Sequence, residues 1–368
     1  MNSLLKFRKP LSSSFISSSW QRFSSTLNYV FKEKKEATSF IHSTAIVHSN
    51  AVIGQGVSVG PFCTIGSSAK LGNGCRLHPS SHIFGNTELG NHCILMTGAV
   101  VGDDIPGRTV IGCNNIIGHH AVVGIKCQDM KYKLGDECFL HIGDNNEIRE
   151  FTSIHRSSKS CDRTVIGDNN LIMGSCHIAH DCKIGNNNIF ANTTLLAGHV
   201  IVEDYVHTGG ATVVHQFCHI GSFSFLGGGS VVSQDVPKYM MVSGDRAELR
   251  GLNLEGLRRC GFQVTEIKSL RTAYRKIFMP RETNSMGFDE RLSEVIWAVF
   301  LLYVLCSSPF AILSLKTVAE YATSDNGAVL ESIARIFTTT AAFRALYSLI
   351  YAHIHNVIEA AIVLTYVT

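Results

Sequence analysis

The chain has 368 residues, of which 45% are hydrophobic and 17% are charged, a balance typical of a globular protein and not of a disordered one. This length allows one large domain or two to three ordinary ones. The formal net charge of +3 argues against nucleic acid as the main partner but still allows a local basic patch for an acidic partner.

The first 31 residues are basic, rich in serine and free of acidic side chains. They lack the continuous apolar core of a secretory signal, and this composition is typical of an organellar transit peptide. Arg22-Phe23-Ser24-Ser25 resembles a matrix-processing site. We therefore predict a mitochondrial protein whose residues 1–35 are a transit peptide outside the fold. A merely disordered N-terminus is the alternative.

From Ile41 onward the sequence repeats every six residues. Aliphatic side chains occupy each sixth position from Ile41 to Val101, and the repeat later continues to Val232 with Thr208 as its one polar member. Three loops interrupt it, near 102–110, 124–141 and 155–165. This period fits neither an amphipathic helix nor an alternating strand, whereas a parallel β-helix builds one short strand and one corner from each hexad. Residues 40–237 are therefore predicted to be all-β, with Asn and Gly at corners that need positive φ.

The twelve cysteines do not have the spacing of a metal or disulfide framework. No Cys-x-x-Cys pair occurs, so zinc-ribbon spacing is absent. Six cysteines lie two residues before an aliphatic repeat position, a phase that points into the core: Cys63, Cys75, Cys93, Cys176, Cys182 and Cys218. Free cysteine behaves there as a small apolar side chain. We expect free thiols in a reducing compartment, with Cys182 and Cys218 inert as nucleophiles.

The hexad pattern resembles the left-handed parallel β-helix of the hexapeptide-repeat acyltransferases. That resemblance implies three hexads in each triangular coil and a left-handed prism. It also implies a homotrimer whose active sites lie between neighbouring prisms.

Coils of three hexads would place residues 18 apart over one another and bring polar side chains to one edge. Those side chains are His177, His180, Asp181, His199 and His215. A neutral His180 can take a proton from a hydroxyl that attacks an acyl carbonyl, and Asp181 can orient its ring. The backbone N–H of Gly198, one coil away, can bind the oxyanion that develops.

Two alternatives stay open for this edge. Corner histidines can simply be solvated. Histidines from adjacent strands also bind zinc in trimeric β-helices of the γ-carbonic-anhydrase type, so the competing hypothesis is a non-catalytic or metal-binding trimeric scaffold in the organelle. The pairs His180-Asp181 and His215-Gln216 favour acid–base chemistry and sugar recognition, and we predict no metal and no cofactor.

Seven motifs stand out across residues 40–294. They are QDMKY (128–132), IREFTSIHR (148–156), HIAHDC (177–182), LAGHV (196–200), VHQFCHIG (214–221), SQDVP (233–237) and NLEGLRRCGF (253–262). Together they resemble the UDP-N-acetylglucosamine O-acyltransferase family of lipid A biosynthesis, in its organellar plant-type form. The resemblance implies transfer of a (3R)-3-hydroxyacyl chain from acyl carrier protein to the glucosamine 3-hydroxyl of UDP-N-acetylglucosamine.

Family roles carry over to the positions that match these motifs. His180 matches the general base, Asp181 its orienting partner and Gly198 the oxyanion donor. The residues that match the acyl and sugar pocket are Asp129, Lys131, His155, His177, His199, His215 and Gln216. Those that match the nucleotide-binding set are Asn253, Glu255 and Arg259.

Two further positions relate to specificity. Gly228 matches the family's hydrocarbon ruler, and glycine there leaves the acyl groove open for a long chain; a plain corner glycine is the alternative. Cys260 stands where the family usually has a second arginine, which weakens one phosphate contact.

After Pro237 the hexads stop and helical periodicity begins, so 238–294 is predicted to be an α-helical domain. Its basic residues suit the acidic surface of acyl carrier protein, and a plain solvated helix face is an equal alternative. The remaining 295–368 is an atypical hydrophobic tail. Within it, 295–315 is 21 residues without a charge, long enough to be a transmembrane candidate. Membrane contact and an alternative transcript both stay open, and we assign no functional residue there.

Overall fold

The computed structural model describes residues 38–279 together with 287 and 291. A boundary after Gln263 divides the chain into two compact units. The first unit holds every strand described below and helix α2 (Leu254–Arg259), and the second holds helix α3 (Val264–Phe278). The predicted transit peptide at 1–35 and the tail at 295–368 lie outside the described residues.

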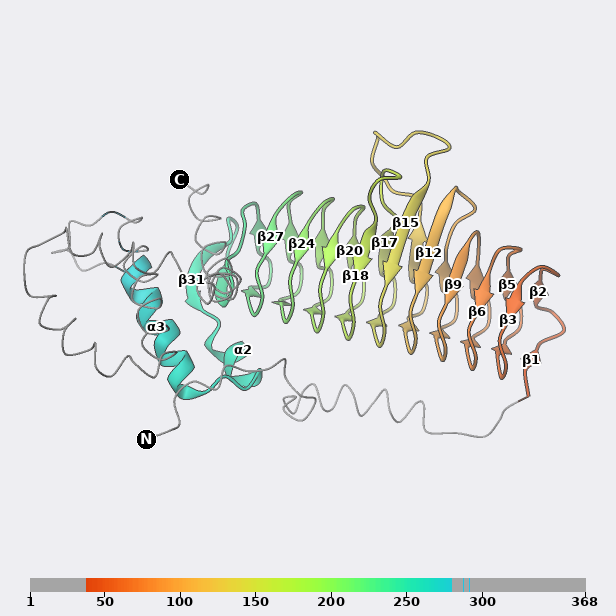
Figure 1. Cartoon of the computed structure of the whole chain (residues 1–368), viewed down its shortest axis with the longest axis horizontal. Coiled ribbons are helices and arrows are strands. Elements are labelled where there is room, and N and C mark those ends of the chain that lie inside the picture. The colour runs from red at the N-terminus through yellow and green to blue at the C-terminus, as the bar shows by residue number, and fades with distance from the viewer. Residues whose placement is uncertain (1–37, 280–286, 288–290, 292–368) are drawn as a thin grey trace, which may run out of the picture. The chain divides into compact units, whose positions relative to one another are not determined.

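The first unit is a parallel β-solenoid, as the hexads predicted, and Figure 1 shows its coils in sequence order. Each complete coil gives one strand to each of three sheets, so strands three apart in sequence are paired. Sheet A has twelve strands: β1 (Phe40–Ile41), β4 (Ser58–Val59), β7 (Arg76–Leu77), β10 (Ile94–Leu95), β13 (Ile116–Ile117), β16 (Glu147–Ile148), β19 (Leu171–Ile172), β22 (Ile189–Phe190), β25 (His207–Thr208), β28 (Phe225–Leu226), β30 (Met240–Ser243) and β31 (Glu248–Leu252).

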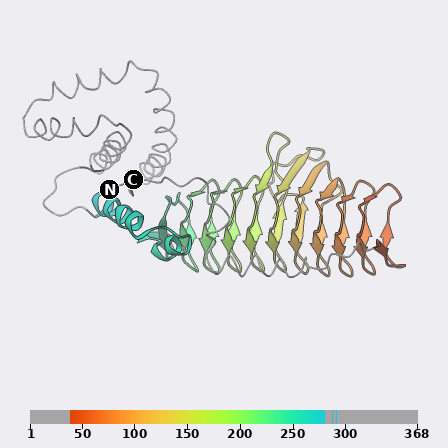
Figure 2. The same ribbon diagram turned by 60° about the horizontal axis from the view of Figure 1, so that its bottom comes forward.

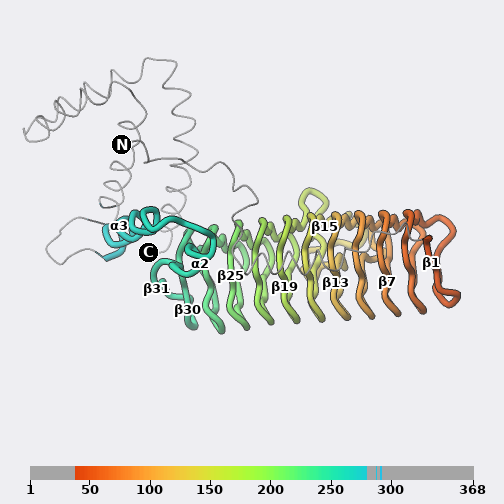
Figure 3. Tube along the Cα trace, turned by 90° about the horizontal axis from the view of Figure 1, so that it is seen from below, coloured from red at the N-terminus to blue at the C-terminus, as the bar shows by residue number. Residues whose placement is uncertain are grey.

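Sheet B has ten strands: β2 (Ile46–Val47), β5 (Thr64–Ile65), β8 (His82–Ile83), β11 (Val100–Val101), β14 (Val122–Ile125), β17 (Ser153–His155), β20 (His177–Ile178), β23 (Leu195–Leu196), β26 (Val213–Val214) and β29 (Val231–Val232). Sheet C has nine: β3 (Val52–Ile53), β6 (Lys70–Leu71), β9 (Thr87–Leu89), β12 (Gly107–Ile111), β15 (Cys138–Ile142), β18 (Thr164–Ile166), β21 (Lys183–Ile184), β24 (Ile201–Val202) and β27 (His219–Ile220). Figures 2 and 3 show the same coils stacked along one axis.

The hexad aliphatics form the core. In the typical two-residue strand the second residue points inward and the first faces out, as in β20, where Ile178 is buried and His177 is half-buried. Each buried Ile, Leu or Val contributes about 1.5–3 kcal/mol relative to leaving it exposed. The polar member Thr208 is also buried, and its hydroxyl lies 2.7 Å from that of Thr194, so its hydrogen-bonding capacity is met inside the column.

Most corners bend at the third residue after the buried aliphatic. That residue has φ near +60°, for example 58° at Asn169 and 60° at Asn187. Asparagine adopts this left-handed conformation more readily than most residues. Asp181 and His199 occupy the same corner position with φ of 61° and 62°, so two candidate site residues lie on this backbone geometry.

The cysteines follow the predicted phase. The six inward-facing thiols named above are all buried, and none of the eleven cysteines in the described part of the chain is in a disulfide. Burial raises the pKa of the Cys182 thiol to about 12, which keeps it protonated. The expectation that Cys182 is unreactive is consistent with this environment.

The chain leaves the coils between β11 and β12, between β14 and β15, and between β17 and β18. The loop after β14 is the long excursion above β15 in Figure 1. Arg156 begins the loop after β17 and is fully buried. Its guanidinium donates to Thr109 Oγ1 at 2.9 Å and to the carbonyl of Ile105 at 3.2 Å, which ties this loop to the loop after β11.

The structure corrects the predicted helical domain at its N-terminal end. Residues 240–252 form the antiparallel pair β30 and β31, and β30 continues sheet A in parallel with β28. Met240 and Val242 are buried while Met241 is half-buried, so these residues alternate as a strand does. Helix therefore begins at Leu254 and not near 238. No helix in the described residues is long and apolar enough to cross a membrane, and the candidate at 295–315 lies outside them.

Candidate active site

The candidate site is built on the edge between sheets B and C, where the chain turns from β20 into β21. His180 and Asp181 form this corner, and both are buried, with 8% and 2% of their surfaces exposed. The side chain of Asp181 is fully buried. Nδ1 of His180 donates to Oδ2 of Asp181 at 2.8 Å. This bond leaves Nε2 of a neutral His180 as the nitrogen with the free lone pair.

The loop after β14 brings a second carboxylate to the far side of the ring. Oδ2 of Asp129 lies 3.9 Å from Nε2 of His180. Its Oδ1 accepts a 2.9 Å bond from the backbone N–H of Lys131, and that bond is the main reason why the pKa of Asp129 is lowered. Lys131 is exposed on the same loop. The repeat break therefore supplies one wall of the candidate site, as a functional loop does.

Gly198 lies against the His180 ring, as the 18-residue coil predicted. The strand register pairs Ile178 with Leu196, and an added Cβ on Gly198 would be 2.7 Å from Nε2 of His180. At a corresponding corner between sheets C and A, the N–H of Asn186 is bonded by Asp204 at 2.6 Å. The N–H of Gly198 has no such partner among the described residues, so it is available to a ligand.

His199 extends the site into the next coil. Its Nε2 lies 3.7 Å from Oδ2 of Asp181, and its ring is edge-on to that of His180 with centroids 5.2 Å apart. Phe217 stacks on the other face of His199, with centroids 4.7 Å apart. His215 and Gln216 are exposed on the same edge one coil further on.

On the preceding coils, His177 and His155 form an edge-on pair with ring centroids 4.7 Å apart. Nδ1 of His177 lies 2.7 Å from the hydroxyl of Ser153. His155 is 1% exposed, and its Nδ1 has no hydrogen-bond partner. Burial, reinforced by His177 and His180, lowers the pKa of His155 to about 4, so this imidazole is neutral at physiological pH.

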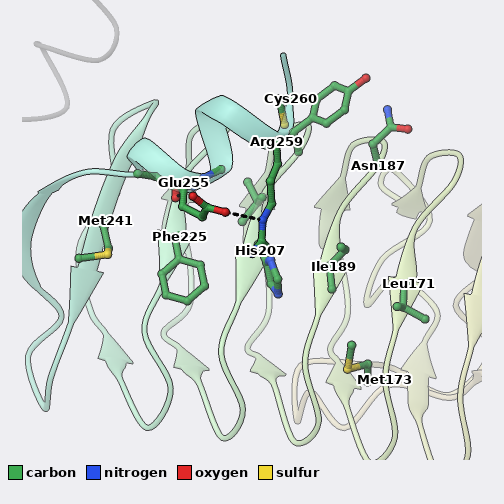
Figure 4. Close-up of a pocket in the computed structure, with 14 residues that line it drawn as sticks. Leu171, Met173, Asn187, Ile189, His207, Phe225, Met241, Glu255, Arg259 and Cys260 are labelled. Carbon is green, nitrogen blue, oxygen red and sulfur yellow. Dashed lines mark hydrogen bonds and ion pairs between the residues drawn. The ribbon is translucent and has the colours of Figure 1, made fainter. Parts of the chain in front are cut away.

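The predicted nucleotide set lies elsewhere on the chain, on α2 over the outer face of sheet A. Asn253, Glu255 and Arg259 line a cavity of about 510 Å³ there, shown in Figure 4. Its floor is formed by outward residues of successive strands: Leu171, Ile189, His207, Phe225 and Met241. Glu255 accepts a 3.0 Å bond from Nε of Arg259. Asn253 is the N-cap of α2, and its Oδ1 accepts a 3.0 Å bond from the N–H of Gly256.

Gly228 is on a third part of the surface, the edge between sheets A and B, where it is exposed. The predicted residues are thus divided among three locations on one chain. His180, Asp181, Gly198, Asp129, Lys131, His155, His177, His199, His215 and Gln216 lie at or beside the edge between sheets B and C, the nucleotide set lies on sheet A, and Gly228 lies between sheets A and B.

Sequence reasoning missed several residues of the site. Ser153, Ser158, Thr164 and Phe217 all contact its histidines or Asp181. Phe217 could have been found, because it lies 18 residues after His199. Ser158 could not, since it follows a break in the repeat where counting by coils no longer gives its neighbours.

Asp181, His180 and His199 are also the one group of possible metal ligands detected in the described residues. Their ligand atoms lie within 4.8 Å of one another. An imidazole, a carboxylate and a second imidazole are ligands that zinc accepts. The same geometry serves acid–base chemistry, because the carboxylate is already hydrogen-bonded to the His180 ring.

Two family models match the chain. One, described as Udp N-acetylglucosamine O-acyltransferase; Domain 2, matches residues 235–321, and a bacterial transferase hexapeptide model with six repeats matches 163–198. The first match continues past Val295, so the family pattern extends further into the apolar tail than the sequence indicated.

Named relatives extend this likeness over most of the chain. The probable mitochondrial acyl-[acyl-carrier-protein]--UDP-N-acetylglucosamine O-acyltransferase of Arabidopsis thaliana is 74% identical over 295 residues, which are 80% of this chain and 88% of that protein. The corresponding enzyme of Nautilia profundicola is 50% identical over 169 residues, 46% of this chain and 65% of its own length.

Solved structures agree. A crystal structure of Arabidopsis UDP-N-acetylglucosamine acyltransferase has a TM-score of 0.70 and 73% identity, and the match covers 78% of this chain and 98% of that one. The enzyme of Moraxella catarrhalis has a TM-score of 0.58 and 38% identity, with 70% and 91% covered. By fold, by the residues at the edge between sheets B and C and by this identity, the chain belongs to the UDP-N-acetylglucosamine O-acyltransferase family.

Proposed function

We propose that the chain transfers a (3R)-3-hydroxyacyl group from acyl carrier protein to the glucosamine 3-hydroxyl of UDP-N-acetylglucosamine, the first step of lipid A biosynthesis, in mitochondria. The substrates and the compartment are those in the names of its relatives. The observation that carries the chemistry is the imidazole of His180, whose Nδ1 is held by a buried carboxylate and whose Nε2 faces the backbone of Gly198.

In the proposed reaction His180 is the general base. Its Nε2 takes the proton of the sugar 3-hydroxyl while that oxygen attacks the thioester carbonyl and forms the new C–O bond. Asp181 holds the ring in the required tautomer and stabilises the imidazolium. The C–S bond then breaks, and the imidazolium returns the proton to the thiolate of the carrier protein.

Gly198 is the proposed oxyanion donor. The carbonyl oxygen becomes negative in the tetrahedral intermediate, and a backbone N–H that is already free of other partners can stabilise it without reorganisation. The proposed steps need no metal and no cofactor, because the thioester supplies the activated acyl group.

The remaining residues are proposed to bind substrate. Asp129 and Lys131 lie on the loop that faces Nε2 of His180, a position that suits contact with the sugar and the reacting groups. The residues proposed to line the acyl and sugar pocket are His155, His177, His199, His215 and Gln216. Asn253, Glu255 and Arg259 are proposed to bind the nucleotide in the cavity beneath α2, where a guanidinium suits phosphate.

The proposed ruler is Gly228. An added Cβ there would meet the backbone oxygen of Gly210 at 3.2 Å and no nearer atom, so a side chain would project from an exposed glycine-rich edge. Larger residues at this position would fill the space that a long acyl chain needs.

We further propose a left-handed prism that forms a homotrimer with its sites between protomers. The hand rests on the resemblance to hexapeptide acyltransferases. The trimer is supported by the position of the nucleotide cavity on sheet A, away from the edge between sheets B and C that carries His180. It is also supported by half-buried apolar residues that face outward on sheet A, such as Ile189 and Phe225.

Acyl carrier protein is the proposed acyl donor. Exposed basic residues of α3, including Lys268, Arg271 and Arg275, offer complementary charge to an acidic protein. This helix belongs to the second unit and is considered by itself.

A metal-binding scaffold is the second candidate function, because His180, Asp181 and His199 form a possible ligand group. Metal analysis of purified protein separates the two. One zinc ion per chain, lost in His199→Ala, would favour the scaffold, whereas metal-free protein with full turnover would exclude it.

The main test is mass spectrometry of the product formed from UDP-N-acetylglucosamine and 3-hydroxyacyl carrier protein. Wild-type protein is expected to give the 3-O-acyl sugar nucleotide, and His180→Ala is expected to give none while its assembly on size exclusion is unchanged. Wild-type turnover by His180→Ala would contradict the proposed role of this residue.

A further inference from the structure

The loop between β17 and β18 reaches the candidate site through one serine. Ser158 lies in this break of the hexad repeat and is 1% exposed. Its hydroxyl donates to Oδ2 of Asp181 at 2.6 Å. Its backbone N–H lies 3.2 Å from each oxygen of the same carboxylate. Ser158 thus contacts the residue that orients His180, and it does not belong to any of the seven motifs.

The carboxylate of Asp181 has two imidazoles to choose from. Oδ2 is 2.8 Å from Nδ1 of His180 and 3.7 Å from Nε2 of His199. A carboxylate can rotate about its last side-chain torsion at little cost, because such terminal torsions are broad. The two donors of Ser158 restrict that rotation, and a 2.9 Å bond from the N–H of Asp181 to Oγ1 of Thr164 fixes the backbone beneath it.

We propose that Ser158 is a positioning residue for the acyl transfer. It holds the carboxylate of Asp181 in the rotation that bonds Nδ1 of His180 and not His199, and so keeps Nε2 of His180 directed at the incoming hydroxyl. The inference rests on the proposed role of His180 as base. A fixed tautomer and ring orientation are what the reaction requires of this imidazole.

The test compares two neighbouring serines. Ser158→Ala is expected to lower kcat about tenfold, the usual scale for losing a partner of a catalytic ligand, with an unchanged KM for UDP-N-acetylglucosamine. Ser158→Thr keeps the hydroxyl and is expected to restore most of kcat. Ser157→Ala is the matched control, because the Ser157 hydroxyl accepts from the N–H of Phe139 at 2.9 Å and donates to the carbonyl of Lys159 at 3.1 Å.

A double-mutant cycle with Asp181→Asn isolates the pathway. Because Ser158 acts through this carboxylate, Ser158→Ala is expected to cost little more in the Asp181→Asn background. Wild-type kcat in Ser158→Ala, equal losses in Ser157→Ala and Ser158→Ala, or additive losses in the double variant would each overturn the inference. These outcomes are separate from failure of the proposed function, which would show as undiminished turnover in His180→Ala.

Discussion

At the scale of single residues, the site combines backbone geometry with chemistry. Asp181 and His199 occupy left-handed corners that asparagine fills elsewhere in the solenoid, as at Asn169 and Asn187. Aspartate and histidine are among the non-glycine residues that tolerate this conformation best. The same corner that ends a strand therefore presents a carboxylate and an imidazole from successive coils at one edge.

Gly198→Ala tests how closely the next coil approaches His180. The added methyl carbon would lie 2.5 Å from Cε1 of His180, so the ring must swing away from Asp181. We expect kcat to fall about 100-fold, the effect of displacing a reacting group by an ångström, with a thermal unfolding midpoint close to that of the wild type. Undiminished kcat would show that the ring does not occupy this position during turnover.

His155 predicts an acid-sensitive fold. Its pKa is lowered to about 4 by burial and by His177 and His180, whereas an unfolded histidine has a pKa of about 6.5. Between these values the unfolded chain binds a proton that the folded chain does not, so stability is lost as the pH falls from about 6.5 towards 4.

His155→Gln removes this titration. The urea midpoint of the variant is expected to change less between pH 7 and pH 4.5 than that of the wild type. The two proteins are compared at the same pair of pH values, which cancels acid effects that arise elsewhere. Parallel midpoints would contradict a neutral, buried His155.

At the scale of elements, the hexads predicted most of the fold. Because each aliphatic fixes a strand and three hexads make a coil, counting placed Gly198 against His180, as found. Counting failed where the repeat breaks, so the sequence gave no neighbours for Ser158 or Thr164. It also failed at 240–252, where two short strands have too few residues for their alternation to stand out.

Asn253 illustrates how an element can position a function. Its side chain caps α2 and also donates to the carbonyl of Phe223 at 2.9 Å, which ties the helix to the solenoid. Asn253→Ala is expected to cost about 1 kcal/mol for the cap alone and to raise the KM for UDP-N-acetylglucosamine by displacing Arg259.

The matched variant is Asn253→Asp, which keeps the capping oxygen and loses the donor to Phe223. Thermal unfolding and KM are measured for both. If Asn253→Ala binds the sugar nucleotide as the wild type does, the helix is held by other contacts and Asn253 has no part in binding.

At the scale of the whole molecule, the proposed site must combine surfaces that one solenoid keeps apart. His180 is on the edge between sheets B and C, and Arg259 is over sheet A. In a cyclic trimer the same two surfaces of neighbouring protomers can meet three times. Activity should then depend on assembly and not only on folding.

Mixed trimers of His180→Ala and Arg259→Ala test this directly. Each variant alone is expected to have lost most of its activity. If the site is shared, random mixing leaves about a quarter of the sites with both residues intact, and activity returns to that extent. If both residues act within one chain, the mixture stays as inactive as its parts. Co-expression with two affinity tags and purification through both gives the sample to assay.

The regular 18-residue spacing of paired strands gives the solenoid something like a reading frame. Deleting one residue from a coil would turn inward side chains outward in every strand that follows until the phase is restored. Inserting residues between β14 and β15, where the chain already leaves the stack, would leave that phase intact. Changes of length are therefore tolerated at the loop beside His180, so this fold can acquire new acceptor specificity by altering that loop while the spacing between His180 and Gly198 is preserved.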